Sequence, residues 1–283
     1  MTCPMSVPLT PGLYIVATPI GNLSDLTARA ADTLRGASLI LAEDKRVTAK
    51  LLAHVQATAP MAVYHDHSSE AERMRILARL GTEAVALVSD AGTPLISDPG
   101  YKLVRAARSA GHAVHTIPGA CAAIAALTLA GLPTDRFLFA GFLPAKAKAR
   151  ADGISDLAAL RASLVFYESG PRLHDSLAAL AAGLGNRDAA VIREISKLHE
   201  ETVTGPLADL AARYAGAHPN GEIVIVVGPP ADRAKASDDD LDDALRIALA
   251  TQTPSRAAKD VAEQLNIPRR RVYARALALG DSD

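Results

Sequence analysis

The chain has 283 residues, of which 49% are hydrophobic and 22% are charged, and its formal net charge is −1. This length allows two compact domains, with room for a small third one, and a core large enough to fold without disulfide bonds. The near-neutral charge argues against a surface coated with nucleic acid, although local basic patches remain compatible with it.

The two cysteines, Cys3 and Cys121, are far apart in the sequence. They indicate neither a disulfide framework nor a zinc site, and a reducing cytoplasm is the expected location. No apolar run approaches the length of a membrane span, and the amino terminus lacks the basic and then apolar pattern of a signal peptide. We therefore expect no membrane association.

Short apolar runs alternate with helical patterns in the first part of the chain. The expected strands are 13–17, 38–42, 61–64, 84–89 and 113–117, and the expected helices are about 24–34, 46–54, 70–80 and 100–110. Ser24 or Asp25 is the expected cap of the first helix. This alternation predicts βαβ units, and hence a largely parallel sheet in an amino-terminal α/β domain over 12–118.

The regular alternation of strands and helices ends after Pro118. A helix of small residues is expected over 120–129, followed by strands at 137–141, 164–167, 189–195, 201–204 and 222–227. The gap Ser196–Glu200 is too short for a crossover helix, so its two flanking strands should be antiparallel. The sequence thus predicts a carboxy-terminal α/β domain with a mixed sheet over 119–230, and a linker over 229–237.

The tail over 238–283 has the pattern of a separate helical module. Five aspartates between 238 and 243 lie at the start of the first helix, where negative charge favours the helix dipole. Between 253 and 280 six Lys and Arg residues face two acidic ones, a local charge of +4 that includes Arg269, Arg270 and Arg271. The pattern resembles a helix-turn-helix module that binds nucleic acid, but a solvated helical tail that serves dimer packing fits equally well.

Three polar loops follow expected strands: Thr18–Asn22, Glu43–Arg46 and Ser89–Pro94. In an open α/β sheet, ligands bind outside the carboxyl ends of the strands, so these loops predict a cleft. Asp90 and Asp98 have carboxylates that accept hydrogen bonds from a ligand with an adenosine or amino-acid part. Taken singly, each loop is more typical of a turn with a capping aspartate.

Several common signatures are missing. Neither G-x-G-x-x-G after the first strand nor G-x-x-x-x-G-K-[ST] is present, which argues against a standard Rossmann dinucleotide site and a P-loop, and no G-x-S-x-G elbow occurs. His65-Asp66-His67 suggests a metal site, but a third ligand is missing from its surroundings in the sequence. A polar cleft edge is the favoured interpretation, and no metal is expected.

Several motifs together resemble one family. They are Leu13-Tyr-Ile-Val-Ala-Thr-Pro-Ile-Gly-Asn-Leu23, Ala42-Glu-Asp44, His65-Asp-His67, SDAGTPLISDPG at 89–100, Ile117-Pro-Gly119, Gly141-Phe-Leu-Pro144, Phe166-Tyr-Glu-Ser169, and Arg193-Glu194 through Glu200-Glu201. In this order, from about Leu13 to Val227, they are similar to the ribosomal RNA small-subunit methyltransferase I family of the tetrapyrrole-methylase superfamily. Lys45, Ser68 and Gly170-Pro171 depart from residues that are common in that family.

The resemblance implies a non-Rossmann, S-adenosylmethionine-dependent methyltransferase with two α/β domains, a helix-turn-helix-like tail module and a homodimeric state. It implies methylation of the ribose 2′-hydroxyl of a cytidine in the decoding centre of small-subunit rRNA, on free rRNA or on the 30S subunit. The residues that it places at the cofactor are Pro19, Ile20, Ser89, Asp90, Ala91, Gly92, Thr93, Pro94, Cys121, Ala122 and Tyr167.

A ribose hydroxyl is a poor nucleophile, so a nearby group that accepts its proton is expected. The candidates are Asp44, Asp98 and Glu168, since each follows an expected strand or lies in its loop. The cations expected to bind RNA phosphates are Arg46, Lys146, Arg150, Arg193, Lys197, Arg269, Arg270 and Arg271. For each of these residues, a surface ion pair is an equally good interpretation, and Asp98 is also placed to cap the following helix.

Two other functions remain open on sequence grounds. One keeps the fold and changes the substrate to a corrinoid or porphyrin-like ring, but ring methylases typically have a glycine-rich loop and a GDP motif where this chain has TPIGN and SDAG. The other is a ligand-sensing regulator that binds DNA through the tail. Methyl transfer to small-subunit particles would distinguish all three.

Overall fold

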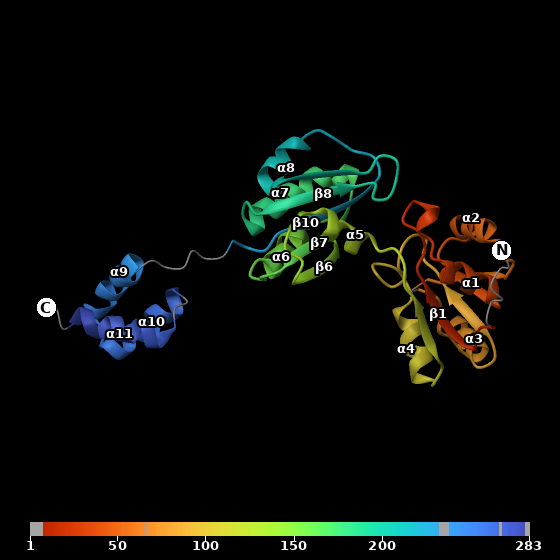
Figure 1. Cartoon of the computed structure of the whole chain (residues 1–283), viewed down its shortest axis with the longest axis horizontal. Helices are drawn as coiled ribbons and strands as arrows, with labels where there is room; N and C mark the ends of the chain where they lie inside the picture. The colour runs from red at the N-terminus through yellow and green to blue at the C-terminus, as the bar shows by residue number, and fades with distance from the viewer. Residues whose placement is uncertain (1–7, 66, 232–237, 266–267, 281–283) are drawn as a thin grey trace. The chain divides into compact units, whose positions relative to one another are not determined.

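The computed structural model describes residues 8–65, 67–231, 238–265 and 268–280 (Figure 1). The chain divides into two compact units, Met1–Pro230 and Ala231–Asp283. Cys3, Asp66 and most of the expected linker lie outside the described residues. Within the described part of the chain, no helix combines the length and the apolar character that crossing a bilayer requires.

Five parallel strands form the first sheet, in the order β3-β2-β4-β1-β5. The elements are β1 (Gly12–Val16), η1 (Leu23–Asp25), α1 (Ala28–Gly36), β2 (Leu39–Ala42), α2 (Lys45–Val55), β3 (Met61–Val63), α3 (Glu70–Leu80), β4 (Ala84–Leu87), α4 (Tyr101–Ser109) and β5 (Val114–Ile117). The alternation of strands and helices predicted from the sequence is confirmed.

Both faces of this sheet are buried. Tyr14 and Val16 pack with α1 and α2 on one face, whereas Leu13 and Ile15 pack with α3 and α4 on the other. Successive side chains of a strand point to opposite faces, so a continuous apolar run fills two core layers at once. This explains why the strands have no polar face in the sequence.

The start of α1 differs from the prediction. Thr27, and neither Ser24 nor Asp25, caps the helix, because its side chain accepts a hydrogen bond from Ala30 N. The Ser24 backbone instead donates to the Asn22 side chain and belongs to the short helix η1. Asn22 and Thr27 therefore divide the segment into two turns, which the apolar spacing alone does not show.

The second sheet is mixed and has the order β6-β7-β10-β8-β9. The elements are α5 (Ala122–Leu129), β6 (Phe137–Phe142), α6 (Ala147–Leu157), β7 (Ser163–Ser169), η2 (Gly170–Arg172), α7 (Leu173–Leu184), β8 (Asp188–Arg193), β9 (Glu201–Pro206), α8 (Leu207–Arg213) and β10 (Glu222–Val227). β8 and β9 are antiparallel, as the short gap between them predicted. The two sheets fall on either side of the predicted boundary at 118/119, which stays a prediction.

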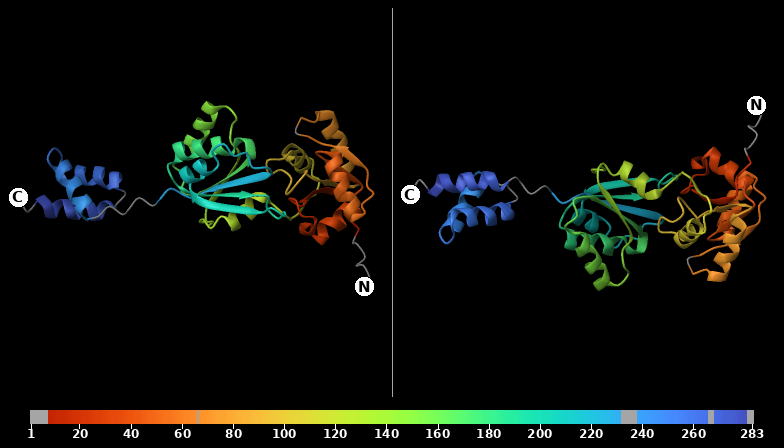
Figure 2. Two further views of the ribbon diagram at one scale, coloured as in Figure 1. Left: turned by 90° about the horizontal axis from the view of Figure 1, so that it is seen from above. Right: turned by 90° about the horizontal axis from the view of Figure 1, so that it is seen from below.

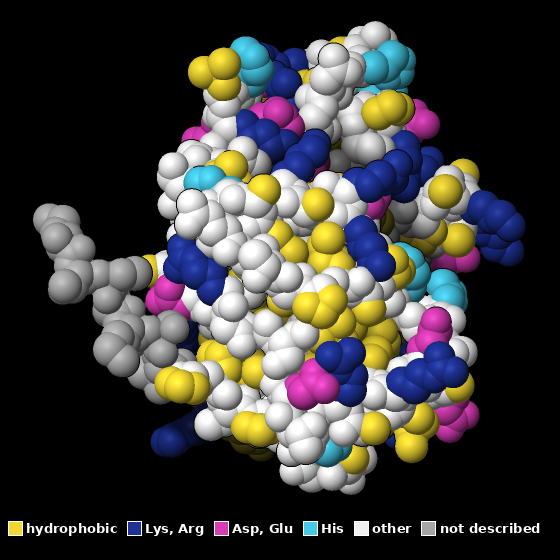
Figure 3. Space-filling view, turned by 90° about the vertical axis from the view of Figure 1, so that its right-hand side faces the viewer, with side chains coloured by type: hydrophobic (Ala, Val, Ile, Leu, Met, Phe, Trp, Pro, Cys, Tyr) yellow, Lys and Arg dark blue, Asp and Glu magenta, His cyan; other side chains and the backbone are white. Residues whose placement is uncertain are grey.

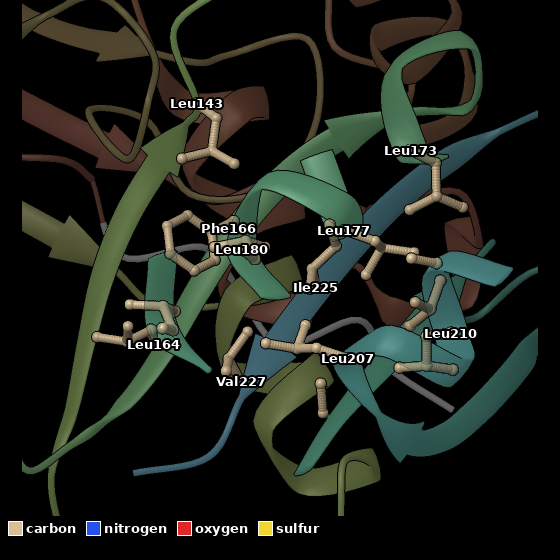
Figure 4. Packing of buried hydrophobic residues seen from close by; sticks show 14 of the residues in the cluster. Leu143, Leu164, Phe166, Leu173, Leu177, Leu180, Leu207, Leu210, Ile225 and Val227 are labelled. Atoms are coloured by element: carbon tan, nitrogen blue, oxygen red, sulfur yellow. The ribbon is translucent and has the colours of Figure 1, made fainter. Parts of the chain in front are cut away.

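Helices lie on both sides of the second sheet (Figure 2). On one side α7 and α8 pack their leucines on Phe166 and Ile225 (Figure 4). On the other side α5 packs Ala123, Ala126 and Leu127 against the sheet. Three helices of this unit, α6, α7 and α8, were not predicted from the sequence, because their alanine-rich sequences give a weak polar face. In α7, Leu173, Leu177, Leu180 and Leu184 nevertheless recur at helical spacing.

The second compact unit contains α9 (Asp238–Leu249), α10 (Pro254–Leu265) and α11 (Arg269–Gly280). Leu241, Leu245, Val261 and Val272 form its small core. Arg275 donates two hydrogen bonds of 2.6 Å to the carboxylate of Asp242, which joins α11 to α9. The three predicted tail helices are confirmed, and they have a core of their own.

Candidate functional site

The carboxyl ends of β1, β2 and β4 lie at one edge of the first sheet, and the loops that follow them are hydrogen-bonded to each other. Thr18 N donates to Gly92 O at 2.8 Å, and Gly92 N donates back to Thr18 O at 3.2 Å. Asp44 N donates to Asp90 Oδ1 at 3.0 Å. The structure therefore brings together the three loops from which the sequence predicted a cleft.

A first cavity, with about 720 Å³ of empty space open to solvent, lies between this edge and the second sheet. Its lining residues are Ile20, Ala91, Gly92, Thr93, Ile96, Ser97, Asp98, Cys121, Ala122, Phe142, Tyr167, Glu168, Glu222, Ile223 and Val224. Seven of the predicted cofactor residues are among them: Ile20, Ala91, Gly92, Thr93, Cys121, Ala122 and Tyr167.

The loop before α4 carries backbone strain at this cavity. Leu95 (φ 76°) and Ser97 (φ 64°) adopt the left-handed conformation that costs non-glycine residues energy. Gly92 (φ 77°) reaches the same region without that cost, and a Cβ there would lie 3.2 Å from the Ile20 side chain. The strained loop places Asp98 in the wall of the cavity.

Asp98 is the carboxylate of the cavity with the most altered proton affinity. Burial raises the pKa of Asp98 to about 6, and the charges of Glu43 and Asp90 add to this rise, while a hydrogen bond with Ser89 opposes it. In the described part of the chain Asp98 makes no ion pair. It is therefore poised to take up or release a proton near neutral pH.

Two aromatic rings from the second sheet form another wall. The ladder between β6 and β7 shifts register before Gly141 (φ 66°), and Phe142 follows this bulge. Phe142 packs edge-to-face with Tyr167 at a centroid distance of 5.7 Å. The Tyr167 hydroxyl accepts a hydrogen bond from Ala123 N at 3.3 Å, and burial raises the pKa of Tyr167 to about 12, so it stays neutral.

A second cavity, also with about 720 Å³ of empty space, lies beside the first. Its lining residues are Thr18, Pro19, Ile20, Gly21, Leu23, Val47, Thr48, Lys50, Leu51, Ser89, Asp90, Ala91, Lys197 and Glu222. Pro19, Ser89 and Asp90, three further predicted cofactor residues, line this second cavity and not the first. Pro94 lines neither.

Lys197 connects the second sheet with the loop that follows β1, at the second cavity. Its Nζ pairs with Glu194 at 2.9 Å and with Glu222 at 3.1 Å. Its aliphatic stem lies against Gly21 so closely that a Cβ there would be 2.4 Å from the Lys197 Cε. The neighbouring Ser196 donates a hydrogen bond to Asp25. These contacts fix the β8–β9 connection against the first loop.

The other two predicted proton acceptors lie in different surroundings. Asp44 lines neither cavity; it caps α2 and pairs with Arg46 at 2.6 Å, and the hydrogen bonds from Arg46 lower the pKa of Asp44 to about 2. Glu168 lines the first cavity, but its carboxylate is 1% exposed, accepts a 2.7 Å hydrogen bond from Ser176 and pairs with Arg172. Both carboxylates are thus engaged in structural contacts.

In the part of the chain that the structure describes, four of the eight predicted RNA-binding cations form ion pairs: Arg46, Arg193, Lys197 and Arg271. Arg193 donates two hydrogen bonds to Glu201, and Arg271 pairs with Asp238 at 2.7 Å. Lys146 and Arg150 lie at the start of α6 and line neither cavity. Arg269 and Arg270 begin α11 in the second unit. Of the five predicted cations in the first unit, Lys197 lines the second cavity and the other four line neither cavity.

Sequence reasoning missed several lining residues. Phe142 stands inside the Gly-Phe-Leu-Pro motif, and Ile96 and Ser97 stand inside SDAGTPLISDPG, so the motifs gave a signal for them. Glu222 and Thr48 had none, because only the folded positions of β10 and α2 bring them to the cavities. Among the described residues, no three or more His, Cys, Asp and Glu side chains form a group that could hold a metal ion.

Comparisons with known proteins agree with this architecture. Residues 12–211 match the model of the tetrapyrrole (corrin/porphyrin) methylases, and residues 235–280 match that of the RsmI C-terminal HTH domain. A solved structure of uroporphyrin-III C-methyltransferase from Thermus thermophilus, in complex with S-adenyl homocysteine, has a TM-score of 0.53 and 20% identity, and the match covers 77% of this chain and 97% of that one. The predicted fold class is confirmed.

Curated relatives match almost the whole chain. Ribosomal RNA small subunit methyltransferase I of Erythrobacter litoralis is 56% identical over 272 residues, which are 96% of each chain. The protein of the same name from Mesorhizobium japonicum is 46% identical, over 97% of this chain and 94% of its own. The chain therefore belongs to the ribosomal RNA small subunit methyltransferase I family, within the tetrapyrrole methylases.

Proposed function

We propose that the protein is an S-adenosylmethionine-dependent methyltransferase that modifies small-subunit rRNA, at the ribose 2′-hydroxyl of a cytidine in the decoding centre. The observation that carries this proposal is the 56% identity, over 96% of both chains, with a relative named ribosomal RNA small subunit methyltransferase I. The first cavity adds a site of suitable chemistry.

The first cavity suits this cofactor. Its ionisable lining residues include the acids Asp98, Glu168 and Glu222 and no Lys or Arg, which favours a cationic sulfonium. Its apolar walls, with Ala122 and Val224, suit an adenine ring. When bound, the cofactor supplies an electrophilic methyl group. The predicted cofactor residues that line this cavity would hold it, and the hydrogen-bonded loop around Gly92 would orient it.

Asp98 is the best placed of the three candidate proton acceptors. It lines the first cavity and makes no ion pair with another described residue, whereas Asp44 and Glu168 are held by Arg46 and Arg172. In the proposed step the ribose oxygen bonds to the methyl carbon, the bond from that carbon to sulfur breaks, and Asp98 takes the hydroxyl proton. A base with a pKa near the working pH suits this role.

We expect the helical tail to contribute to RNA binding through its arginines. We expect the combined change of Arg269, Arg270 and Arg271 to Ala to weaken binding to small-subunit rRNA and to flatten its dependence on salt, because up to three phosphate contacts are lost. Filter binding between 50 and 200 mM salt measures this slope. An unaltered slope would leave the tail as a packing element. Arg105, Arg108 and Lys102 on α4 changed together to Ala provide a control of equal charge.

We also propose a homodimer in the cytoplasm, where ribosomes are found. β3 stands at an edge of the first sheet and exposes Val63, and Met74 on α3 is 59% exposed. The face that Figure 3 shows has apolar side chains between Lys and Arg side chains. Sedimentation equilibrium is expected to give twice the chain mass of 29.5 kDa. A single-chain mass at micromolar concentration would contradict the dimer.

The decisive experiment for the activity combines two measurements. Mass spectrometry of rRNA from cells with and without this protein should locate a 2′-O-methylated cytidine that depends on it. Purified protein should then transfer a labelled methyl group to small subunits from the deficient cells. Transfer to a porphyrin-like ring, with none to either rRNA or subunits, would overturn the proposal.

A further inference from the structure

The hydroxyl of Thr48 on α2 is buried without a partner. Thr48 is 2% exposed, and its Oγ1 makes no hydrogen bond with any described residue. Such a group costs about 1–3 kcal/mol relative to a satisfied one. Thr33 on α1 behaves differently, since its Oγ1 donates to Arg29 O, four residues earlier, at 2.8 Å. Thr48 leaves the equivalent bond unmade.

Thr48 also lines the second cavity. It lies on one face of α2 with Val47 and Leu51, and this face meets the loop that follows β1. A buried polar group without a protein partner at the wall of a cavity is accounted for when a ligand supplies the partner. The unpartnered Thr48 hydroxyl is therefore evidence for a ligand in this cavity.

The chemistry of the cavity suits one nucleotide. Ile20, Val47 and Leu51 offer aliphatic walls to a flat ring, and Leu23 and Val47 are 48% and 40% exposed at its edge. Ser89 and Asp90 add polar groups. Enzymes that flip a base out of its strand hold it between aromatic or apolar side chains and recognise its edge by hydrogen bonds.

A phosphate also has a partner at this cavity. Two lysines line it, and Lys197 is already neutralised by Glu194 and Glu222. Lys50 is exposed and makes no ion pair with another described residue. A free ammonium beside an apolar slot is a suitable anchor for the phosphate of a bound nucleotide.

The two cavities share a wall made of Ile20, Ala91 and Glu222. Asp98 lies in the first cavity and has a hydrogen bond with Ser89, which lines the second. Methyl transfer needs donor and acceptor in adjacent positions, with the reacting atoms about 3 Å apart. Neighbouring cavities with a proton acceptor beside their shared wall meet this need.

We propose that the second cavity binds the target nucleotide of the RNA substrate, flipped out of its strand, and that the Thr48 hydroxyl hydrogen-bonds this nucleotide. The inference rests on the proposed function and extends it, because it names where the acceptor lies and a residue that positions it. Thr48 is a positioning residue here and Lys50 a phosphate contact.

The test is Thr48→Val, which removes the hydroxyl and keeps the shape. We expect kcat/KM for methyl transfer to unmodified small subunits to fall about tenfold, equivalent to about 1.4 kcal/mol. The affinity for S-adenosylmethionine, measured by calorimetry, should stay within about twofold, and Tm should be unchanged or higher because an unsatisfied buried group is gone. Thr33→Val is the matched control: methyl transfer should be unchanged, and Tm should fall.

Three results would overturn the proposal. The first is methyl transfer by Thr48→Val at the wild-type rate, and the second is a loss of cofactor affinity in this variant as large as its loss of kcat/KM. The third is binding of cytidine 5′-monophosphate to Thr48→Val with the same affinity as to the wild-type protein. The last measurement uses NMR titration in the presence of S-adenosylhomocysteine and needs no catalysis. If the wild-type protein transferred no methyl group to rRNA and the mononucleotide still bound less well to Thr48→Val, the proposed function would fail while the nucleotide site would stand.

Discussion

The change Asp98→Asn is expected to lower kcat for methyl transfer by a factor of about 10² to 10⁴, which is the usual contribution of a positioned general base. The amide has the same shape but accepts no proton from the ribose hydroxyl. Asp98 is one of three acids that line the cofactor cavity, and Glu168 and Glu222 remain in the variant, so the cofactor should still bind with a modestly lower affinity. Single-turnover transfer to unmodified small subunits, together with calorimetry of cofactor binding, separates the two effects.

The pH dependence of the wild-type enzyme gives an independent check. Burial raises the pKa of Asp98 to about 6, so the carboxylate is mostly ionised at pH 7.5 and mostly protonated at pH 5. We expect kcat to fall by about tenfold for each pH unit below about 6, where the base is protonated. The residual activity of Asp98→Asn should lack this step.

The same pKa shift predicts a change in stability. The folded-state pKa lies above the value of 3.8 expected for an exposed Asp, so ionisation of Asp98 favours the unfolded chain. The free energy of unfolding should therefore fall as the pH rises from about 4 to about 6, and stay lower above this range. Asn has no charge to ionise, so the free energy of unfolding of Asp98→Asn should not fall in this way. At pH 7 the variant should be more stable than the wild type by roughly 1 kcal/mol, a value kept small because solvent screens a partly exposed group.

Asp209, exposed in the first turn of α8 and outside both cavities, offers a matched control. Asp209→Asn should leave kcat, its pH profile and the stability near the wild-type values. If Asp98→Asn kept more than half of the wild-type rate, Asp98 would not be the proton acceptor. A large loss of cofactor affinity in that variant would instead assign Asp98 to cofactor binding.

The second large effect concerns Gly170, at the start of η2. A Cβ built there lies 1.7 Å from the carbonyl oxygen of Pro219 and 2.8 Å from its carbonyl carbon. Backbone cannot give way as a flexible side chain does, so Gly170→Ala must displace the 218–220 loop or η2. We expect a loss of about 3 kcal/mol in the free energy of unfolding, which corresponds to roughly 5–10 °C in Tm.

Gly153 in α6 provides a control of opposite sign. A Cβ there meets nothing within 4 Å, so Gly153→Ala should stabilise the protein by about 0.5–1 kcal/mol through the better helix propensity of alanine. Thermal unfolding of both variants tests the pair. Similar Tm values for Gly170→Ala and the wild type would mean that the 218–220 loop does not pack on η2.

The requirement for glycine at position 170 could not be predicted from the sequence. In the sequence, Gly170-Pro171 is only a turn dipeptide that departs from the usual family residues. Its requirement for glycine comes from Pro219, which is 49 positions further along the chain. Contacts between such distant segments depend on sheet pairing, and the local sequence contains no record of them.

Some features of the candidate site could be predicted from the sequence, and others could not. The order of strands and helices, the three polar loops and the SDAGTPLISDPG motif could be predicted, because apolar period and turn chemistry are local properties. The same reasoning ranked Asp44, Asp98 and Glu168 as equal candidates. Only the structure separates them, since it shows which carboxylate has an arginine partner and which does not.

The sequence by itself determined the fold class, the antiparallel pair β8–β9 and the separate helical tail. The tertiary structure alone decided that most predicted cofactor residues divide between two cavities, that Thr48 lacks a hydrogen-bond partner among the described residues, and that Lys197 packs on Gly21 while it pairs with Glu222. The physical reason is the range of the forces involved. Helix and strand propensities act over a few residues, whereas burial, ion pairing and the proton affinity of Asp98 depend on neighbours that only folding brings close.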